Sequence, residues 1–303
     1  MKHRNLSRSW HLVKPGTNAL LSVMFALLGL LTFLPVLLVI IISFSSDSSI
    51  AENGYSFFPS SWSLDAYRYV WKSIDYIGHS FLLSIVVMVL GTLLSLWLIS
   101  TMAYVLSRRD FKLKKIYTAL ILIPMFFGGG LAASYVVNTQ LFGLKNSIFA
   151  LLLPPACSSW YIIIMRTYFR KNIPVELYDA AEMDGAGPVR IFFRIVLPLS
   201  KPILITVGLF QAFAYWNSWY YAMLYISPNH KELYPLQYVL YSIQRNIEFM
   251  ATNENISGAV VMELPAETFR MAMVALTIAP ILVTYPFFRK FFVKGILTGA
   301  IKE

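Results

Sequence analysis

The chain of 303 residues is 57% hydrophobic and only 13% charged, and its net charge is +10. Soluble domains carry roughly 25% charged residues, so this chain has too few charges to cover a soluble surface. The same numbers exclude a disordered chain. A single cysteine, Cys157, excludes a disulfide framework and a cysteine cluster for a metal, and we expect it to be a buried, small apolar side chain.

Six uncharged, apolar runs follow one another along the chain. A helix that crosses a bilayer needs roughly 20 mostly apolar residues. The runs are Ala19–Ser43, Phe81–Ser107, Ile116–Val137, Ser147–Met165, Pro202–Ser227 and Met271–Phe288. They predict an all-α integral membrane protein with six transmembrane helices in residues 19–289, between an N-terminal segment 1–18 and a tail 290–303. The first run is too long for a signal peptide and lacks a cleavage site, so we expect an uncleaved first helix.

The basic residues predict the orientation of these helices. Nineteen of the 25 Lys and Arg residues lie in segments 1–18, 108–115, 166–201 and 289–303. The loops between these segments, 44–80, 138–146 and 228–270, hold nine of the 15 acids. By the positive-inside rule the basic segments are cytoplasmic, and both termini with them. The basic balance therefore indicates a membrane and not a nucleic acid.

Two of the predicted outer loops are long. Loop 44–80 contains Trp62, Tyr67, Tyr69 and Trp71, and such residues near a membrane surface are typical interfacial anchors. Loop 228–270 is long for a plain connection and carries the polar segment Gln244–Ser257. We hypothesise that it offers a docking surface to a partner outside the membrane.

The cytoplasmic loop 170–201 predicts a short helix. Pro174 suits the first position of a helix, and the acids Glu176, Asp179 and Glu182 favour its N-terminal half, where the helix dipole is positive. Gly185 suits the left-handed residue that ends a helix. A helix this short is marginal in water without a surface to pack on. That surface is either a cytoplasmic partner or the rest of this chain, and the residues leave both open.

The same loop resembles the signature of the membrane subunits of binding-protein-dependent ABC importers. That signature reads E-A-A, three residues, G, nine residues, I-x-L-P. The matching residues are Asp179-Ala180-Ala181, Gly185 and Ile195-Val196-Leu197-Pro198, and Asp184-Gly185-Ala186 matches the longer form found in sugar permeases. Asp179 departs from the family's Glu: it keeps the charge and shortens the reach by one methylene.

The resemblance extends over the whole chain. The Trp216-Asn217 pair and the basic tail resemble the maltose-type second permease, and the end from Tyr285 to Gly295 is similar to the oligosaccharide and polysaccharide branch, including the second permease of alginate importers. This implies a type I ABC importer permease fold in the bacterial inner membrane, transporting a saccharide. It also implies a second permease, two ATPase subunits that bind ATP and Mg, and an extracytoplasmic solute-binding protein. The chain itself has no phosphate-binding G-x-x-x-x-G-K-[ST] motif and is not expected to be an enzyme or to hold a cofactor or metal.

Two groups of candidate site residues follow. The resemblance implies that a coupling helix docks on the ATPase through Glu176, Asp179, Ala180, Ala181, Glu182, Asp184, Gly185, Ala186, Leu197 and Pro198. Candidates for the substrate pathway are the polar and aromatic residues Tyr135, Asn138, Gln211, Tyr215, Trp216, Asn217, Ser218 and Trp219. Gln211, Tyr215 and Ser218 are spaced to share one face of the fifth helix.

Two alternatives remain at this point. Polar side chains inside a membrane also serve as hydrogen bonds between helices, so each pathway residue has this structural interpretation as well. For the function, the alternative is a self-contained secondary transporter or channel. Such proteins usually show intramembrane charges or internal repeats.

Overall fold

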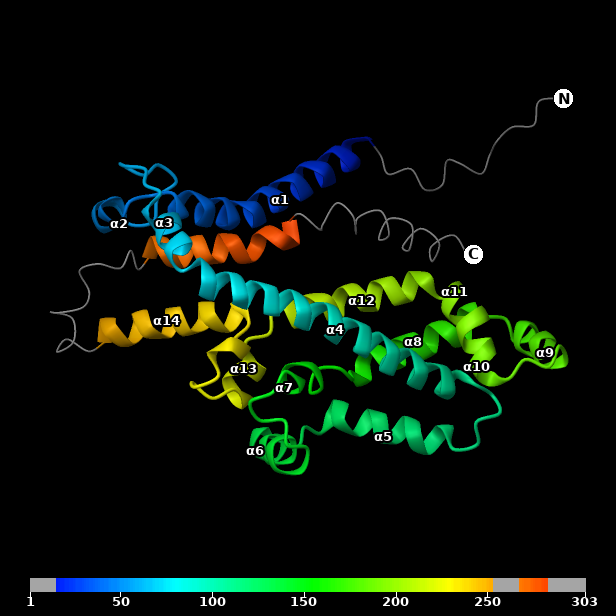
Figure 1. Cartoon of the computed structure of the whole chain (residues 1–303). Coiled ribbons are helices and arrows are strands. Elements are labelled where there is room, and N and C mark those ends of the chain that lie inside the picture. The colour runs from blue at the N-terminus through cyan, green and yellow to red at the C-terminus, as the bar shows by residue number, and fades with distance from the viewer. Residues whose placement is uncertain (1–14, 253–266, 283–303) are drawn as a thin grey trace, which may run out of the picture. The chain divides into compact units, whose positions relative to one another are not determined.

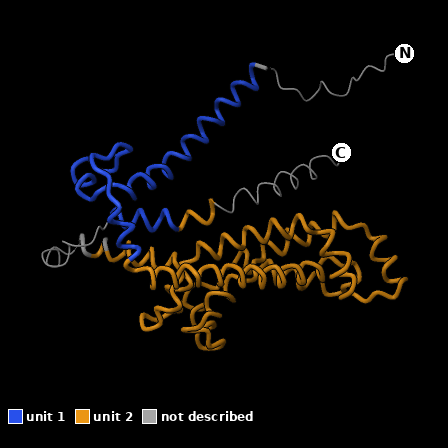
Figure 2. The backbone as a smooth tube through the Cα atoms, turned by 45° about the horizontal axis from the view of Figure 1, so that its top comes forward, with its two compact units in different colours: residues 1–71, 258–276 blue, residues 72–257, 277–303 orange. Residues whose placement is uncertain are grey.

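The computed structural model describes residues 15–252 and 267–282, and these residues are predominantly helical (Figure 1). The chain divides into two compact units, residues 1–71 with 258–276 and residues 72–257 with 277–303 (Figure 2). Each unit is described by itself below.

The first unit begins with the long apolar helix α1 (Pro15–Ser43), which contains the first predicted span. Loop 44–80 includes two short helices, α2 (Asp47–Asn53) and α3 (Asp65–Lys72). The Ser43 Oγ lies 2.8 Å from the Tyr67 hydroxyl, and the Tyr67 ring stacks on Phe44 at 4.7 Å. Tyr67 therefore ties α3 to the end of α1.

The second unit is built around α4 (Ile74–Ser107). Its other helices are α5 (Lys114–Phe126), α6 (Leu131–Val136), α7 (Phe149–Leu152), α8 (Ser159–Asn172), α9 (Val175–Met183), α10 (Pro188–Ile191), α11 (Leu197–Leu199), α12 (Lys201–Trp216), α13 (Tyr220–Tyr225) and α14 (Leu236–Thr252). Turns of π-helix cover Val137–Leu141 and Phe192–Val196, and a turn of 3-10 helix covers Lys231–Leu233. Residues 267–276 of the first unit and 277–282 of the second are also helical.

Three of the six predicted spans, the third, fourth and fifth, are interrupted helices, and the fifth divides into α12, which ends at Trp216, and α13, which begins at Tyr220. Among the described residues, two helices are long and apolar enough to cross a membrane, α1 and α4, and up to four if each of two bent pairs is one span. One pair bends by 117° at the glycine run 128–130, where Gly130 has a φ of +81°. The fourth run breaks at Pro154-Pro155 between α7 and α8, and Cys157 in this break is exposed, contrary to our expectation. Residues 1–14 and 283–303 lie outside the described part of the chain.

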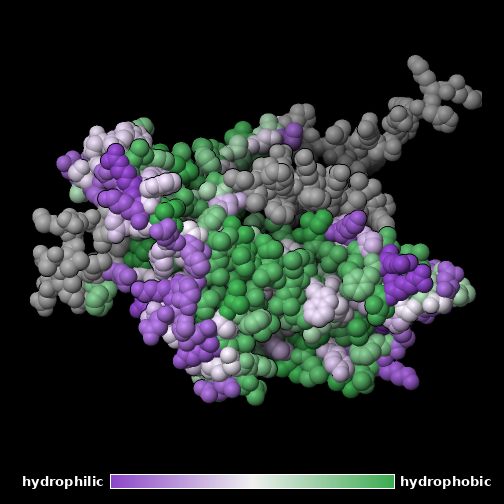
Figure 3. Space-filling model, in the orientation of Figure 1, coloured by the Kyte–Doolittle hydropathy of each residue, from purple (hydrophilic) through white to green (hydrophobic). Residues whose placement is uncertain are grey.

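Small residues let α12 approach α4 closely. The Tyr215 ring lies so near Gly91 that an added Cβ would overlap it. The Tyr215 hydroxyl donates a hydrogen bond to the Leu152 carbonyl at 2.7 Å and lies 3.2 Å from the Ser95 Oγ. Such close approach is typical of helix packing inside membranes. Figure 3 shows apolar residues over the middle of this unit and hydrophilic residues toward its ends.

The two ends of α4 carry different partners. Near its N-terminal end, the Ser84 Oγ accepts a hydrogen bond from the Leu236 N–H of α14 at 2.8 Å. Just beyond its C-terminal end, Arg108 pairs with Glu182 of α9. At 1.5 Å per residue, Ser84 and Arg108 are about 36 Å apart along the helix. This exceeds the ~30 Å hydrocarbon core of a bilayer, so α14 and α9 belong to opposite ends of the unit.

Candidate functional site: the loop that carries α9

The predicted short helix is present as α9. Pro174 immediately precedes it, with φ −58° and ψ 143°, so it occupies the capping position and not the first helical one. Gly185 has a φ of +76°, and its N–H donates to the Glu182 carbonyl at 3.0 Å. Left-handed backbone of this kind strains a residue with a side chain. Glycine therefore allows the chain to leave α9 and turn toward α10.

One side of α9 packs on the chain itself. Ala181 is 9% exposed and belongs to a cluster with Phe169, Ile173 and Ile191. Ala180 is exposed, and so is Met183, at 84%. The alanine pair of the signature thus divides between an inner and an outer face. Of the two surfaces that the sequence left open, the chain itself is present beneath α9, and a second face of the helix is left exposed.

Arg108 fixes α9 to the end of α4. Its guanidinium donates two hydrogen bonds to Asp110, at 2.9 and 3.0 Å, and one to Glu182 at 2.5 Å. It also lies over the ring of Tyr178, 5.2 Å from the centroid. The Arg108 side chain is only 14% exposed. Paired charges in such a fork geometry have a defined orientation as well as an attraction.

The protonation states keep this anchor intact at neutral pH. The hydrogen bonds from Arg108 lower the pKa of Asp110 below its usual value. The hydrogen bond to Asp110 raises the pKa of Arg108 in turn. Burial raises the pKa of Tyr178 to about 12, so its hydroxyl stays neutral. The Arg108 cation therefore stays paired with an ionised Asp110 beside the neutral ring of Tyr178.

Further contacts hold the rest of the loop. The Tyr104 hydroxyl of α4 donates to the Pro188 carbonyl at 3.1 Å, and its ring lies 5.0 Å from that of Phe192. The Arg166 Nε of α8 donates to the Leu106 carbonyl at 3.2 Å. A cavity of about 230 Å³ remains between the ends of α4, α8 and α9. The loop is thus positioned by helices that run back through the unit.

The predicted coupling residues lie along this loop. The exposed ones are Glu176, Asp179, Ala180, Glu182, Asp184, Gly185 and Pro198, whereas Ala186 and Leu197 are half-buried. Sequence reasoning missed Arg108 and Tyr178 as parts of the site, because Arg108 counted there only toward the orientation. Its signal was its place at the end of a long apolar helix, one residue beyond Ser107.

Three pathway candidates are buried on α12 where this helix packs against α4, a contact that we call the seam of α12. Gln211, Tyr215 and Trp216 are 2%, 2% and 3% exposed. The Trp216 Nε1 donates to the Thr277 carbonyl at 3.2 Å. Ser218 is not on this helix face as predicted, because α12 ends at Trp216 and Asn217 follows as its cap. Tyr215 and Trp216 therefore support the interpretation of hydrogen bonds between segments of the chain.

The other candidates gather around α13 and α14. Tyr135 stacks on Tyr225 at 5.9 Å, and the Asn138 amide donates to the Tyr225 hydroxyl at 2.9 Å. Trp219 stacks on Tyr241 of α14 at 4.2 Å. The Asn217 carbonyl oxygen accepts a hydrogen bond from the Gln237 amide at 3.3 Å. The candidates thus form two separate groups, one in the seam and one around α13.

Comparison with known proteins identifies the family. Residues 95–298 match the model of the family described as binding-protein-dependent transport system inner membrane component. The chain is 38% identical to the polygalacturonan/rhamnogalacturonan transport system permease protein YtcP of Bacillus subtilis, over 92% of this chain and 94% of that one. It is 36% identical to protein LplC of the same organism, over 90% of each.

A solved structure agrees. The crystal structure of a bacterial ABC transporter involved in the import of the acidic polysaccharide alginate matches with a TM-score of 0.77 at 28% identity, over 91% of this chain and 96% of that one. The predicted resemblance to ABC importer permeases is thereby confirmed. The prediction that the chain is a transport subunit and not an enzyme is confirmed as well. A component of this type works with an ATPase and a binding protein. The chain belongs to the binding-protein-dependent transport system inner membrane components, the permease subunits of ABC importers.

Proposed function

We propose that this chain is one of two different permease subunits of an importer for oligo- or polysaccharides, and that α9 couples it to the ATPase. Relatives support the substrate class: besides YtcP, the arabinooligosaccharides transport system permease protein AraQ of Bacillus subtilis is 26% identical over 93% of this chain. The alginate importer has the same fold. Each of these proteins is named for a sugar polymer or its fragments.

The observation that carries the proposal is the two-sided placement of α9. Its inner side is fixed by Arg108 and by the packing of Ala181. Its outer side presents the carboxylate of Glu176 and the apolar side chain of Met183, and Asp179 is exposed beside the cavity between α4, α8 and α9. Exposed apolar side chains beside charges are typical of a surface that meets a protein. A rigidly held helix with a free face suits transmission of a push from a partner.

The contacts also suggest how the push travels. Arg108 joins the end of α4 to the part of the loop before Gly185, and Tyr104 joins α4 to the part after it. A displacement of α9 by the ATPase therefore displaces α4. Because Tyr215 ties α12 to α4 and to α7, these helices follow. In this account the opening and closing of the pathway is a movement of packed helices and not of α9 alone.

The proposed orientation follows from the positive-inside distribution of the Lys and Arg residues. The α9 end, both termini and the tail 290–303 face the cytoplasm, and residues 19–289 form the transmembrane domain in the inner membrane. The α14 end then faces outward, where the binding protein delivers its cargo. The self-contained transporter or channel is not retained, because the family is a component of binding-protein-dependent systems.

A reconstitution tests this function. The chain is expressed with its second permease and a tagged ATPase, purified in mild detergent and placed in liposomes. We expect the ATPase to carry this chain through purification, and saccharide uptake to require ATP and the binding protein. Uptake of saccharide by the permeases without ATPase subunits would overturn the proposal, as would an ATPase that fails to retain the chain.

A further inference from the structure

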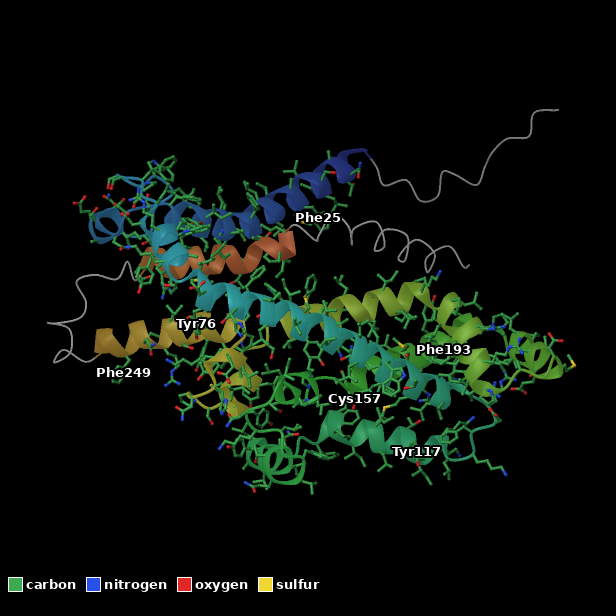
Figure 4. All side chains as sticks on the ribbon, in the orientation of Figure 1. Phe25, Tyr76, Tyr117, Cys157, Phe193 and Phe249 are labelled. Carbon is green, nitrogen blue, oxygen red and sulfur yellow. The ribbon has the colours of Figure 1, made fainter. Side chains whose placement is uncertain are left out.

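A groove on α14 has no part in the coupling loop or in the seam of α12. It has a volume of about 240 Å³ and is lined by Tyr238, Tyr241, Ser242, Arg245, Asn246 and Phe249. Phe249 projects from the C-terminal half of α14 (Figure 4). Sites for drug-sized ligands measure ~300–1,000 Å³. The groove therefore suits a smaller group, of the size of one sugar ring.

The floor of the groove is held in place. The Leu236 N–H donates to the Ser84 Oγ of α4 at 2.8 Å, which fixes the start of α14. The Tyr241 ring stacks on Trp219 at 4.2 Å, and the Tyr238 ring meets Tyr234 edge to face at 4.5 Å. Because these contacts order the rings in advance, a ligand that stacks on them loses little entropy to side-chain ordering.

The polar groups of the groove favour an anionic ligand with hydroxyls. Arg245 is exposed, and within the described residues no carboxylate lies within 4 Å of its guanidinium, which sits 5.9 Å from the Tyr241 centroid. A guanidinium matches a carboxylate in a two-pronged fashion. The Ser242 hydroxyl donates to the Tyr238 carbonyl at 2.6 Å, so its oxygen is left to accept. The Asn246 amide adds a donor and an acceptor.

We propose that this groove binds one uronate residue of an acidic saccharide at the end of the permease opposite α9. The Tyr238 and Tyr241 side chains border the sugar, Arg245 pairs with its carboxylate, and Asn246 and Ser242 meet its hydroxyls. The proposal rests on the proposed function for the saccharide class and for the outward direction of this end. It names the charge of the substrate, which that function leaves open.

The test measures binding to the complete transporter in nanodiscs of zwitterionic lipid, without the binding protein. The probes are trigalacturonate and its methyl ester. We expect the acid to bind, and Arg245→Gln to weaken it about tenfold, the size of one lost charge-assisted hydrogen bond. We expect the methyl ester to bind weakly, and with equal affinity to the wild type and to Arg245→Gln. Lys231→Gln is the matched control, since Lys231 is an exposed cation near the start of α14 and outside the groove.

Three results would overturn the proposal that the groove binds a uronate residue. One is equal binding of trigalacturonate by the wild type and Arg245→Gln. Another is an equal loss in Lys231→Gln, which indicates nonspecific attraction. The third comes from parallel nanodiscs that contain anionic lipid: if that lipid stabilises the transporter only when Arg245 is present, and trigalacturonate does not bind, Arg245 contacts lipid and not substrate. Uptake separates these outcomes from failure of the proposed function. Normal uptake with an unchanged KM for the acid in Arg245→Gln rejects the groove alone, whereas a wild type that takes up no saccharide rejects the function.

Discussion

Replacement of Arg108 by glutamine removes the anchor between α4 and α9. The lost contacts are two hydrogen bonds to Asp110 and one to Glu182. A hydrogen bond to a charged group contributes roughly 1.5–3 kcal/mol where it is protected from water. The Asp110 and Glu182 side chains are 68% and 47% exposed, so solvent brings each pair toward the ~0–1 kcal/mol of a surface ion pair. In the part of the chain that the structure describes, only the Glu182 hydrogen bond and the contact with the Tyr178 ring join Arg108 to α9, and together they stabilise the anchored loop by about 1–1.5 kcal/mol.

The assay compares ATP hydrolysis with transport in the reconstituted importer. A loss of about 1.4 kcal/mol lowers the ratio of anchored to loosened α9 about tenfold. We therefore expect Arg108→Gln to assemble with the ATPase and hydrolyse ATP, while transport per ATP falls, by up to about tenfold. Arg109→Gln is the control, because it removes the same charge from an exposed neighbour with no side-chain hydrogen bond among the described residues.

Two outcomes would refute this reasoning. Full coupling in Arg108→Gln shows that the anchor is dispensable. Equal damage in Arg109→Gln shows that the charge of the loop matters and not the contact. The double variant with Glu182→Gln sharpens the comparison, since residues in one network are not additive. We expect Glu182→Gln to add little once Arg108 is lost.

The other predictions concern α9 and the seam of α12. Gly185→Val should uncouple hydrolysis from uptake, because φ +76° costs a branched residue ~1–2 kcal/mol, while Gly187→Ala at φ −72° should transport normally. Asp179→Lys should likewise hydrolyse ATP without uptake, because it reverses an exposed charge of α9; normal uptake contradicts the assignment. Tyr215→Phe leaves the Leu152 carbonyl without its donor. It should lower stability by about 1–3 kcal/mol, seen as a lower Tm in detergent, and an unchanged Tm contradicts the packing role.

Local signals predicted the helices that depend on local chemistry. Pro174 and Gly185 bracket α9 within two residues, because a missing N–H and a left-handed backbone act on their own neighbours. The apolar runs of α1 and α4 are long enough to specify helices by themselves. The interruption after Trp216 was not predicted, since uncharged residues continue through it to Ser227.

Two features were missed, one for a local reason and one because it depends on a contact between distant residues. α14 lies inside the predicted loop 228–270, where charges such as Arg245 break the uncharged run. Its apolar residues still recur at helical spacing, as Leu236, Val239, Leu240 and Ile243 show, so a periodicity search would find it. The pair Arg108–Glu182 joins residues 74 apart in the sequence. No local pattern predicts such a pair, because it exists only when α4, α8 and the loop pack together.

The central claim is that α9 meets the ATPase, and crosslinking tests it most directly. Cys157 is the single cysteine, so Cys157→Ala provides a background for new ones. Met183→Cys then carries a photoreactive maleimide on the free face of α9, and Lys231→Cys carries it near α14 in the complete transporter. The account predicts an adduct of the ATPase at position 183 and none at position 231. An ATPase adduct at 231, with none at 183, would contradict it.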